Sequence, residues 1–344
     1  MRLRNFGPFV MLAALTVSAC ASTRAASTPT RAPQSPTATS SAAHVNYQQL
    51  HLYDVPGPPT DIAVSANEIF VAEVYAGARP ADVTASILKA ALRVGATLAE
   101  VPGSRVGPGA GIYGIAIHDN AVYMSEAASG TRAASGIFRV ATPPMAIVGG
   151  STASGGSAGN GDGGPALSAV LQGPQGFAFD SSGDLFIAEA GDSRIRLVRD
   201  GTISTYAGTG ACTGPTPPNG PAQTTAVCNP SLVAIGRDGA VYAAQRDELA
   251  WIVRIMRDTV TAISNDFPVT GLAIDTDGSL LAADGREGRI VRIATTGPAS
   301  ASVVASGLGS VRGLAVGGDG SIYFASRTQS TSTIWGLYQL RRMP

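Results

Sequence analysis

The sequence predicts an all-β protein, a six-bladed β-propeller that an N-terminal strand closes by pairing with the last blade. Two short apolar runs joined by a tight turn recur six times along the chain. The last copy lacks one strand, and a spare strand stands before the first copy. Four-stranded units repeated around one axis are the architecture of a propeller.

The first run of each unit carries a small residue, which suits an innermost strand where the blades crowd toward the axis. These runs are DIAV, GIAI, GFAF, LVAI, GLAI and GLAV, around Ala63, Ala116, Ala178, Ala234, Ala273 and Ala315. The second runs are EIFVAE, AVYMSE, DLFIAE, AVYAA, SLLAAD and SIYFAS. Residues 175–207 form the clearest unit, because four strands follow one another there at hairpin spacing.

The two ends of the repeat region predict how the ring closes. After the sixth pair of runs the chain forms one more strand, Ile334 to Leu340, and then ends. Residues 47–55 (YQQLHLYDV) read as a strand before the first unit. We expect this strand to become the outer strand of the last blade, because pairing there hides an open sheet edge.

Residues 1–19 have the features of a signal peptide. Arg2 and Arg4 precede an apolar stretch that ends in Val17, Ser18, Ala19 and Cys20. Small residues directly before a cysteine resemble the bacterial lipobox, which implies that the Cys20 thiol is acylated and becomes the mature N-terminus. Ordinary secretion with a chance cysteine is the alternative. A transmembrane anchor is disfavoured, because the apolar run is shorter than the roughly 20 residues that span a bilayer.

Residues 20–45 are predicted to be a disordered tether, and residues 46–344 the propeller. The tether consists almost entirely of Ser, Thr, Ala and Pro, which cannot form a core. With an acylated Cys20, the protein would be extracytoplasmic and anchored to the bacterial cell membrane through its N-terminal lipid only.

Charge and cysteine content narrow the class of protein further. The formal net charge is +0, and no Lys/Arg cluster provides a footprint for nucleic acid. Cys212 and Cys228 lie in one Gly/Pro/Thr-rich segment, and the compartment is oxidising, so we expect them to form a disulfide. Two free thiols or a metal site are the alternatives, the latter weakened because the segment contains no His.

The repeats resemble NHL repeats, which read approximately Gly-Ile/Val-Ala-Val-Asp, a Gly turn, Leu-Tyr-Val-Ala-Asp and then Asn-Arg-Ile. The third unit matches best, in Gly176 to Asp180, Gly183 to Glu189 and Ser193 to Ile195. Gly161 to Ala166 (GDGGPA) and Tyr206 to Gly210 (YAGTG) resemble segments that flank blades in bacterial members. The resemblance covers about residues 47–340. It implies a six-bladed propeller and no single activity.

Acidic residues leave most of the second strands, on the face of a propeller where ligands usually bind. Together with Asp61 they form a candidate axial ring for Ca²⁺, a hard ion that takes oxygen ligands: Asp61, Glu73, Glu126, Glu189 and Asp284. The favoured alternative is structural, because each acid that ends a second strand has an arginine at a near-constant offset. The expected pairs are Glu73–Arg79, Glu126–Arg132, Glu189–Arg194 and Asp284–Arg289.

Histidine is too sparse for most hydrolytic sites. The chain has only His44, His51 and His118, which fall in the tether, the closing strand and a turn on the opposite face. A Ser-His-Asp relay or a His-rich zinc site needs imidazoles that converge. The remaining enzyme class is the calcium-dependent lactonases and esterases resembling gluconolactonase and SMP-30. That family opens its first blade with Glu-Gly-Pro, where this chain has Gly57 to Asp61.

A binding or scaffold role is therefore favoured over catalysis, and no catalytic residue or resident cofactor is assigned. Two inserted loops, Gly149 to Gly173 and Gly208 to Pro230, enter consecutive blades on the ligand face. They are either recognition loops or family-typical structure. Three rim arginines could meet an acidic partner, an envelope protein or polymer, or be solvated surface residues: Arg246, Arg312 and Arg327. A propeller that supports envelope polymers without a defined pocket is a third possibility, and a monomer is expected.

Three further residues are expected to be structural. Asp162 lies between glycines in GDGG, which indicates a turn more than a calcium loop. Trp251 and Trp335 stand beside Ile and Val in third strands, so we expect them to pack between blades.

Overall fold

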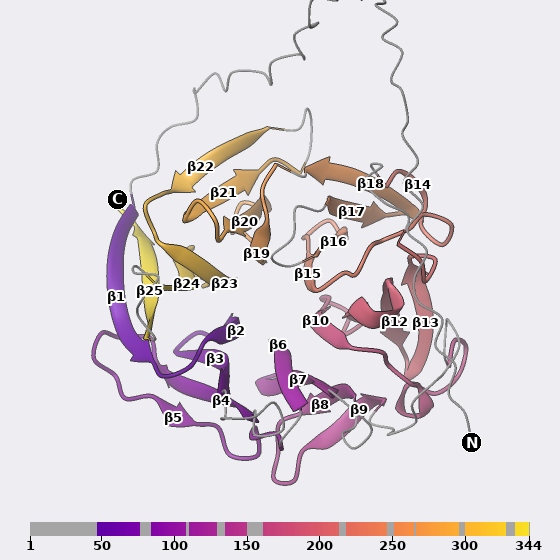
Figure 1. Cartoon of the computed structure of the whole chain (residues 1–344), viewed down its shortest axis with the longest axis horizontal. Coiled ribbons are helices and arrows are strands. Elements are labelled where there is room, and N and C mark those ends of the chain that lie inside the picture. The colour runs from indigo at the N-terminus through magenta and orange to yellow at the C-terminus, as the bar shows by residue number, and fades with distance from the viewer. Residues whose placement is uncertain are drawn as a thin grey trace, which may run out of the picture. The chain divides into compact units, whose positions relative to one another are not determined.

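The protein is a six-bladed β-propeller, seen along its axis in Figure 1. The computed structural model describes residues 47–75, 84–107, 110–128, 135–149, 161–212, 218–245, 251–264, 266–295, 300–327 and 334–343. Each blade is an antiparallel sheet whose first strand lies innermost. Within these ranges no helix is long and apolar enough to cross a membrane.

The first three blades each contain four consecutive strands. Blade 1 consists of β2 (Pro59–Val64), β3 (Glu68–Tyr75), β4 (Thr84–Ala91) and β5 (Ala99–Glu100). Blade 2 consists of β6 (Ala110–His118), β7 (Ala121–Ala128), β8 (Gly136–Arg139) and β9 (Met145–Gly149). Blade 3 follows a short 3₁₀ turn, η2 (Ala166–Ser168), and consists of β10 (Pro174–Phe179), β11 (Leu185–Glu189), β12 (Arg194–Arg199) and β13 (Thr202–Ala207), with η3 (Ala190–Asp192) after β11.

The last three blades depart from this scheme twice. Blade 4 has five strands, β15 (Leu232–Ile235), β16 (Val241–Ala244), β17 (Ile252–Met256), β18 (Thr259–Ser264) and, outside them, β14 (Gly220–Pro221). Blade 5 is regular, with β19 (Val269–Ile274), β20 (Leu280–Asp284), β21 (Arg289–Ile293) and β22 (Ala301–Ala305). Blade 6 consists of β23 (Ser310–Val316), β24 (Ile322–Arg327), β25 (Trp335–Arg342) and β1 (Tyr47–Val55).

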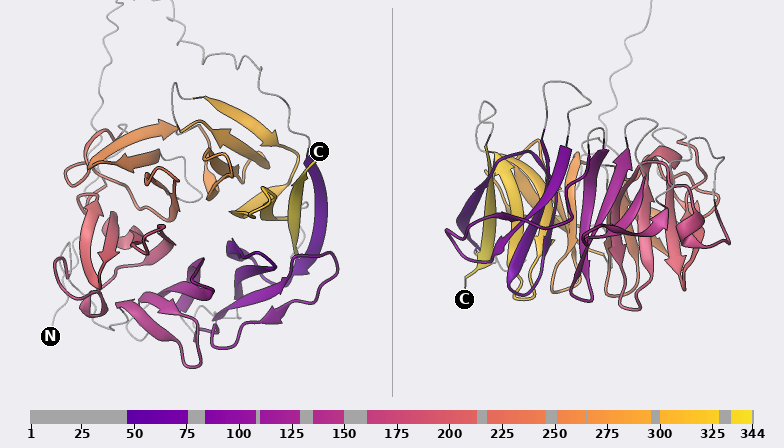
Figure 2. Two further views of the ribbon diagram at one scale, coloured as in Figure 1. Left: turned by 180° about the vertical axis from the view of Figure 1, so that it is seen from behind. Right: turned by 90° about the horizontal axis from the view of Figure 1, so that it is seen from below.

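The predicted closure of the ring is confirmed. β1 pairs antiparallel with β25 from Tyr47 opposite Arg342 to Val55 opposite Trp335, and Figure 2 shows it as the outer strand of the last blade. Val55 is fully buried, and the Tyr53 hydroxyl donates a hydrogen bond of 2.9 Å to the Ala91 carbonyl of blade 1. Burial raises the pKa of Tyr53 to about 12. The closing strand therefore contacts the first blade as well as completing the last.

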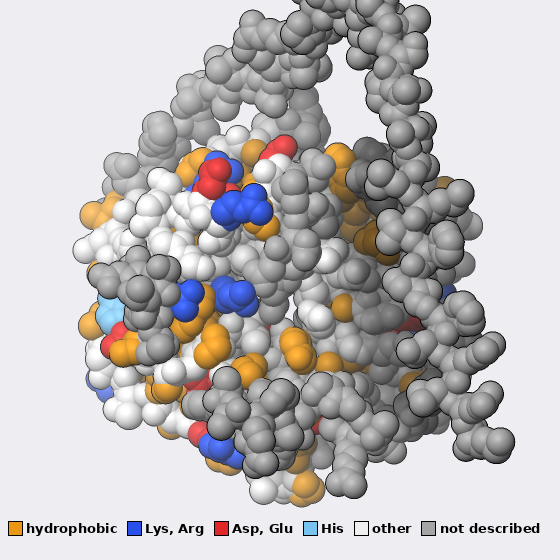
Figure 3. All heavy atoms as spheres, in the orientation of Figure 1, with side chains coloured by type: hydrophobic (Ala, Val, Ile, Leu, Met, Phe, Trp, Pro, Cys, Tyr) orange, Lys and Arg blue, Asp and Glu red, His pale blue; other side chains and the backbone are white. Residues whose placement is uncertain are grey.

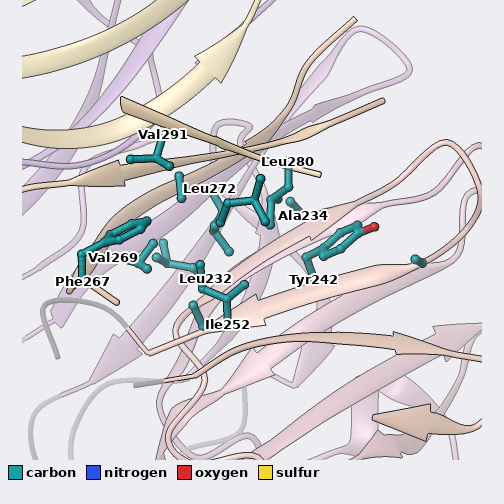
Figure 4. Close-up of a cluster of buried hydrophobic side chains, with 13 residues drawn as sticks. Leu232, Ala234, Tyr242, Ile252, Phe267, Val269, Leu272, Leu280 and Val291 are labelled. Atoms are coloured by element: carbon teal, nitrogen blue, oxygen red, sulfur yellow. The ribbon is translucent and has the colours of Figure 1, made fainter. Parts of the chain in front are cut away.

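The hydrophobic core lies between neighbouring blades. Between blades 4 and 5, for example, Leu232 and Ile252 pack against Phe267 and Val269 (Figure 4). Every second residue of each strand points into such an interface, so each strand contributes to the two cores that flank its blade. Trp335 is buried in the core beside blade 1, as predicted.

The innermost strands touch one another around the whole ring. Each of the six contacts the next, and β23 contacts β2. Glycines at bulges in these strands allow the approach: a Cβ on Gly114 would lie 2.6 Å from the Gln175 carbonyl oxygen, and one on Gly176 would lie 2.8 Å from that of Ser231. Gly176 also donates its N–H to Ser231 over 3.1 Å. The blades are thus joined main chain to main chain near the axis.

Replacing Gly176 by Ala tests this contact. The new Cβ would meet backbone atoms of the next blade that cannot move aside, so we expect Gly176→Ala to lower the free energy of unfolding by about 1–3 kcal/mol. Gly318→Ala is the matched control, because a Cβ there meets nothing within 4 Å. Its effect should stay within about 0.5 kcal/mol in the same urea titration. Equal effects of the two substitutions would contradict the close approach.

Candidate functional site

The acids that end the second strands bind the loops beside them. The Glu73 carboxylate is fully buried and accepts the N–H of Gly57 at 3.0 Å. Asp284 accepts the N–H groups of Arg286 at 3.0 Å and Glu287 at 3.1 Å, and its second oxygen accepts from Nε of Arg289 at 3.0 Å. The predicted Asp284–Arg289 pair is therefore present. Glu73 thus holds the chain that enters blade 1, and Asp284 holds the loop between the second and third strands of blade 5.

Glu189 forms a different ion pair from the predicted one. Its Oε2 accepts from Nη1 of the fully buried Arg196 at 2.8 Å, and its Oε1 accepts the N–H of Gln172 at 2.5 Å. The predicted Glu189–Arg194 pair is wrong: Arg194 lies opposite Glu189 in the strand register, but its guanidinium bonds Asp192 and the Thr209 carbonyl. The turn η3 places Asp192 nearer to Arg194 than Glu189 is.

Arg196 connects this ion pair to the inserted loop before blade 3. Nη2 of Arg196 donates to one carboxylate oxygen of Asp162. The other oxygen of Asp162 accepts from the Thr205 hydroxyl at 2.7 Å. Asp162 thus lies in a turn, as predicted, and fixes that turn to blade 3. Burial raises the pKa of the Glu189 carboxyl, and the bonds from Arg196 oppose that shift.

The other two predicted ring members lie in separate surroundings. Asp61 accepts the N–H of Ile115 at 3.0 Å, which joins blade 1 to blade 2. Glu126 lies near the end of β7, and burial raises the pKa of its carboxyl. In the described part of the chain, no three His, Cys, Asp or Glu side chains come close enough to hold a metal ion. The five acids of the candidate ring are therefore not brought together there. Three predicted arginines, Arg79, Arg132 and Arg246, lie outside the described residues.

Repeated ion pairs do occur, but on the opposite face of the ring. At the turn between the first two strands, an acid pairs with a base of the third strand in four blades. The pairs are Glu68–Lys89 at 2.9 Å, Asp184–Arg199 at 2.5 Å, Asp238–Arg254 at 2.7 Å and Asp277–Arg292 at 2.6 Å. The signal that could have found most of them is the Asp beside a Gly turn followed by an Arg in the third strand.

The described histidines lie on separate elements. His51 is in the outer strand β1, and His118 is the last residue of β6, where it stacks on Phe179 at 4.4 Å. His44 lies outside the described residues.

The inserted loops are built into the blades where they are described. Residues 150–160 and 213–217 lie outside the described residues. In the first loop, Ala166, Ala169 and Leu171 are buried in the core beside blade 3. The second loop contains β14 and the predicted disulfide, which is confirmed between Cys212 and Cys228. These parts of the loops extend the hydrophobic core and the sheet.

A basic rim lies on the ligand face of blade 6. The guanidinium groups of Arg312 and Arg327 lie 6.0 and 5.2 Å from the ring centre of the buried Trp335. Such cation–π contacts hold the arginines in place. Figure 3 shows basic side chains gathered on this face over β23 and β24, with a second group over β20 and β21.

A small open pocket of about 200 Å³ lies beside this rim, between blades 5 and 6. Its lining residues come from the ligand-face ends of three strands: Pro268, Thr270, Gly285, Arg286, Ser310 and Arg312. The sequence interpretation included Arg312 but missed the others. Among the residues that were missed, only Arg286 has a signal in the sequence that could have identified it. It follows Asp284, the acid that ends the second strand of its blade, by two residues.

Several solved structures share the fold at low sequence identity. A gluconolactonase from Xanthomonas campestris gives a TM-score of 0.56 at 13% identity, over 88% of this chain and 91% of its own. The PQQ-bound aldose sugar dehydrogenase of Streptomyces coelicolor gives a TM-score of 0.53 at 16% identity, over 87% of this chain and 100% of its own. A streptogramin B lyase gives a TM-score of 0.52 at 14% identity, over 88% of this chain and 100% of its own. Similarity at these identities shows the fold alone. No protein-family model and no curated protein matches the chain.

The Glu189–Arg196 pair can be tested by neutralising its acid. Glu189→Gln removes the negative charge that balances the fully buried guanidinium of Arg196. We therefore expect a loss of about 3–5 kcal/mol in the free energy of unfolding. Glu287→Gln is the control, since its bond to Arg289 is exposed and should contribute less than about 1 kcal/mol. Chemical denaturation of both variants measures the difference. If the two variants lost equal stability, the buried pair would not have the role described here.

Proposed function

We propose that this protein is a lipid-anchored extracytoplasmic propeller of the NHL type, which binds an acidic envelope protein or polymer on the ligand face of blades 5 and 6. The observation that carries the proposal is the concentration of arginine there. Arg286, Arg312 and Arg327 come from neighbouring strand ends, and two of them stack on one indole. Guanidinium groups are suited to carboxylates and phosphates, which they bind through paired hydrogen bonds.

The rigidity of the scaffold supports a binding role. The acids of this face are engaged with backbone N–H groups and arginines, as Glu73, Glu189 and Asp284 illustrate. They fix the loops, and the arginines of the rim project from strand ends that cannot shift far. A fixed array of like charges favours recognition of an anionic surface.

The lactonase alternative has the gluconolactonase similarity in its favour, which concerns the fold. It needs carboxylates that are free to hold Ca²⁺ near the axis. Calcium-dependent hydrolysis of gluconolactone by the purified chain, abolished by EDTA, would overturn a role limited to binding.

The acidic-partner proposal predicts binding to defined polymers. We expect the full-length chain to bind alginate or polyglutamate but not neutral dextran, and to bind more weakly as salt rises. The double variant Arg312→Gln/Arg327→Gln should lose at least about tenfold in affinity. Arg93→Gln/Arg237→Gln, which removes two exposed charges from the opposite face, should bind normally. Biolayer interferometry with immobilised polymers measures all three proteins. Binding to dextran as tight as to the acidic polymers would refute the proposal.

The lipid anchor predicts a separate outcome for Cys20→Ser in bacterial cells. Without the thiol no acyl chain can be attached, so the chain should move from the membrane fraction to the soluble envelope fraction and lose palmitate label. Cys212→Ser/Cys228→Ser keeps Cys20 as its single cysteine and should remain labelled. Label that persists in Cys20→Ser would show that the anchor lies elsewhere.

A further inference from the structure

The pocket between blades 5 and 6 is formed by three chain segments at the ligand face. Pro268 and Thr270 stand at the start of β19, and Arg286 follows the end of β20. Ser310 and Arg312 open β23 of the next blade. β23 packs against both β19 and β20. The walls of the pocket therefore belong to two blades that contact one another directly.

The lining of the pocket is positively charged. Arg286 and Arg312 contribute two guanidinium groups, and none of the six lining residues is acidic. The nearby acids Asp284 and Glu287 both bond Arg289. Within the described ranges, Arg286 itself has no salt bridge to a carboxylate. Two like charges on one small pocket repel each other, and an anion between them would relieve that repulsion.

The walls of the pocket are fixed before any ligand binds. A Cβ on Gly285 would lie 2.6 Å from Cγ2 of Thr270 and 3.0 Å from the Val311 carbonyl oxygen, so the chain passes there at the closest possible distance. The Thr270 hydroxyl donates to the Ala283 carbonyl at 3.2 Å, and Asp284 holds the Arg286 N–H. Arg312 lies over Trp335. A pocket held in this way loses little freedom on binding.

We propose that this pocket binds one oxyanion group, a carboxylate or a phosphate, borne on a body the size of a single sugar. Its volume of about 200 Å³ is below the roughly 300–1,000 Å³ of pockets for drug-sized ligands. The two arginines bind the oxyanion, and the hydroxyls of Ser310 and Thr270 face the polar body. This rests on the proposed function and sharpens it: a pendant acidic group of the partner enters the pocket while the rest contacts the rim.

Small monomeric probes test the pocket separately from the rim. Titration calorimetry of the full-length chain at low salt would compare glucuronate, glucose 6-phosphate and glucose. We expect at least one of the two anions to bind and glucose not to bind. Arg286→Gln should weaken binding by about tenfold to a hundredfold, Arg286→Lys by less, and Arg237→Gln not at all. A preference between the anions identifies carboxylate or phosphate as the group recognised.

Three results would overturn the inference: no heat with either anion, equal binding of glucose, or unchanged binding by Arg286→Gln. Its failure is distinguishable from failure of the proposed function. If the rim double variant loses alginate binding while no monomeric anion binds, the acidic-partner role stands and the pocket is not its site. If anions bind through Arg286 but acidic polymers do not, the pocket stands and the polymer proposal falls.

Discussion

The close approach of six innermost strands around one axis is the constraint on which the rest of the structure depends. Bulged glycines in β6, β10, β19 and β23 let these strands approach the next strand closely, and the ring of contacts returns from β23 to β2. Without a fourth strand the last blade would expose the unpaired N–H and C=O groups of an open sheet edge. The pairing of β1 with β25 supplies that strand, and Arg342 at the end of β25 bonds the buried Asp275 of blade 5 at 2.8 Å. The completed last blade thus bonds both of its neighbours, blade 1 through Tyr53 of β1 and blade 5 through Arg342 of β25.

The same crowding explains how the ligand face is organised. Loops must be held where their strands converge: Glu73 and Glu189 hold the segments that enter their blades, and Asp284 holds the loop between β20 and β21. A carboxylate engaged with two or three donors is costly to remove from them, because those donors would remain buried and unsatisfied. The arginines of the rim lie beside Trp335 and the small pocket.

Most of the fold could be predicted from the sequence, because its signals are local. Each of these signals can be read within a short stretch of sequence. They are the alternation of apolar residues in the strands, the turn residues between them, and the spare strand at residues 47–55. The disulfide could be predicted for the same reason, since Cys212 and Cys228 share one segment. The Glu189–Arg194 pair was predicted wrongly, because strand register places two residues opposite each other without fixing where a long side chain bonds.

The pocket could not be predicted, because it combines residues that are distant in sequence. Thr270, Arg286 and Arg312 meet only after two blades have packed, and no repeat offset links them. The ion pairs of the opposite face were missed for another reason. In three of them the base follows the acid by 15 or 16 residues, and in Glu68–Lys89 it follows by 21. A search across the second turn alone, five or six residues from each acid, does not compare the first turn with the third strand.

A crystal structure of the protein soaked with glucuronate and calcium would test the functional conclusion most directly. We expect the carboxylate of the sugar acid between the guanidinium groups of Arg286 and Arg312, with the acids at the ends of the second strands still bonded to their loops. Calcium on the axis, coordinated by Glu73, Glu126 or Glu189 with the sugar acid bound to it, would contradict the binding role and favour a lactonase.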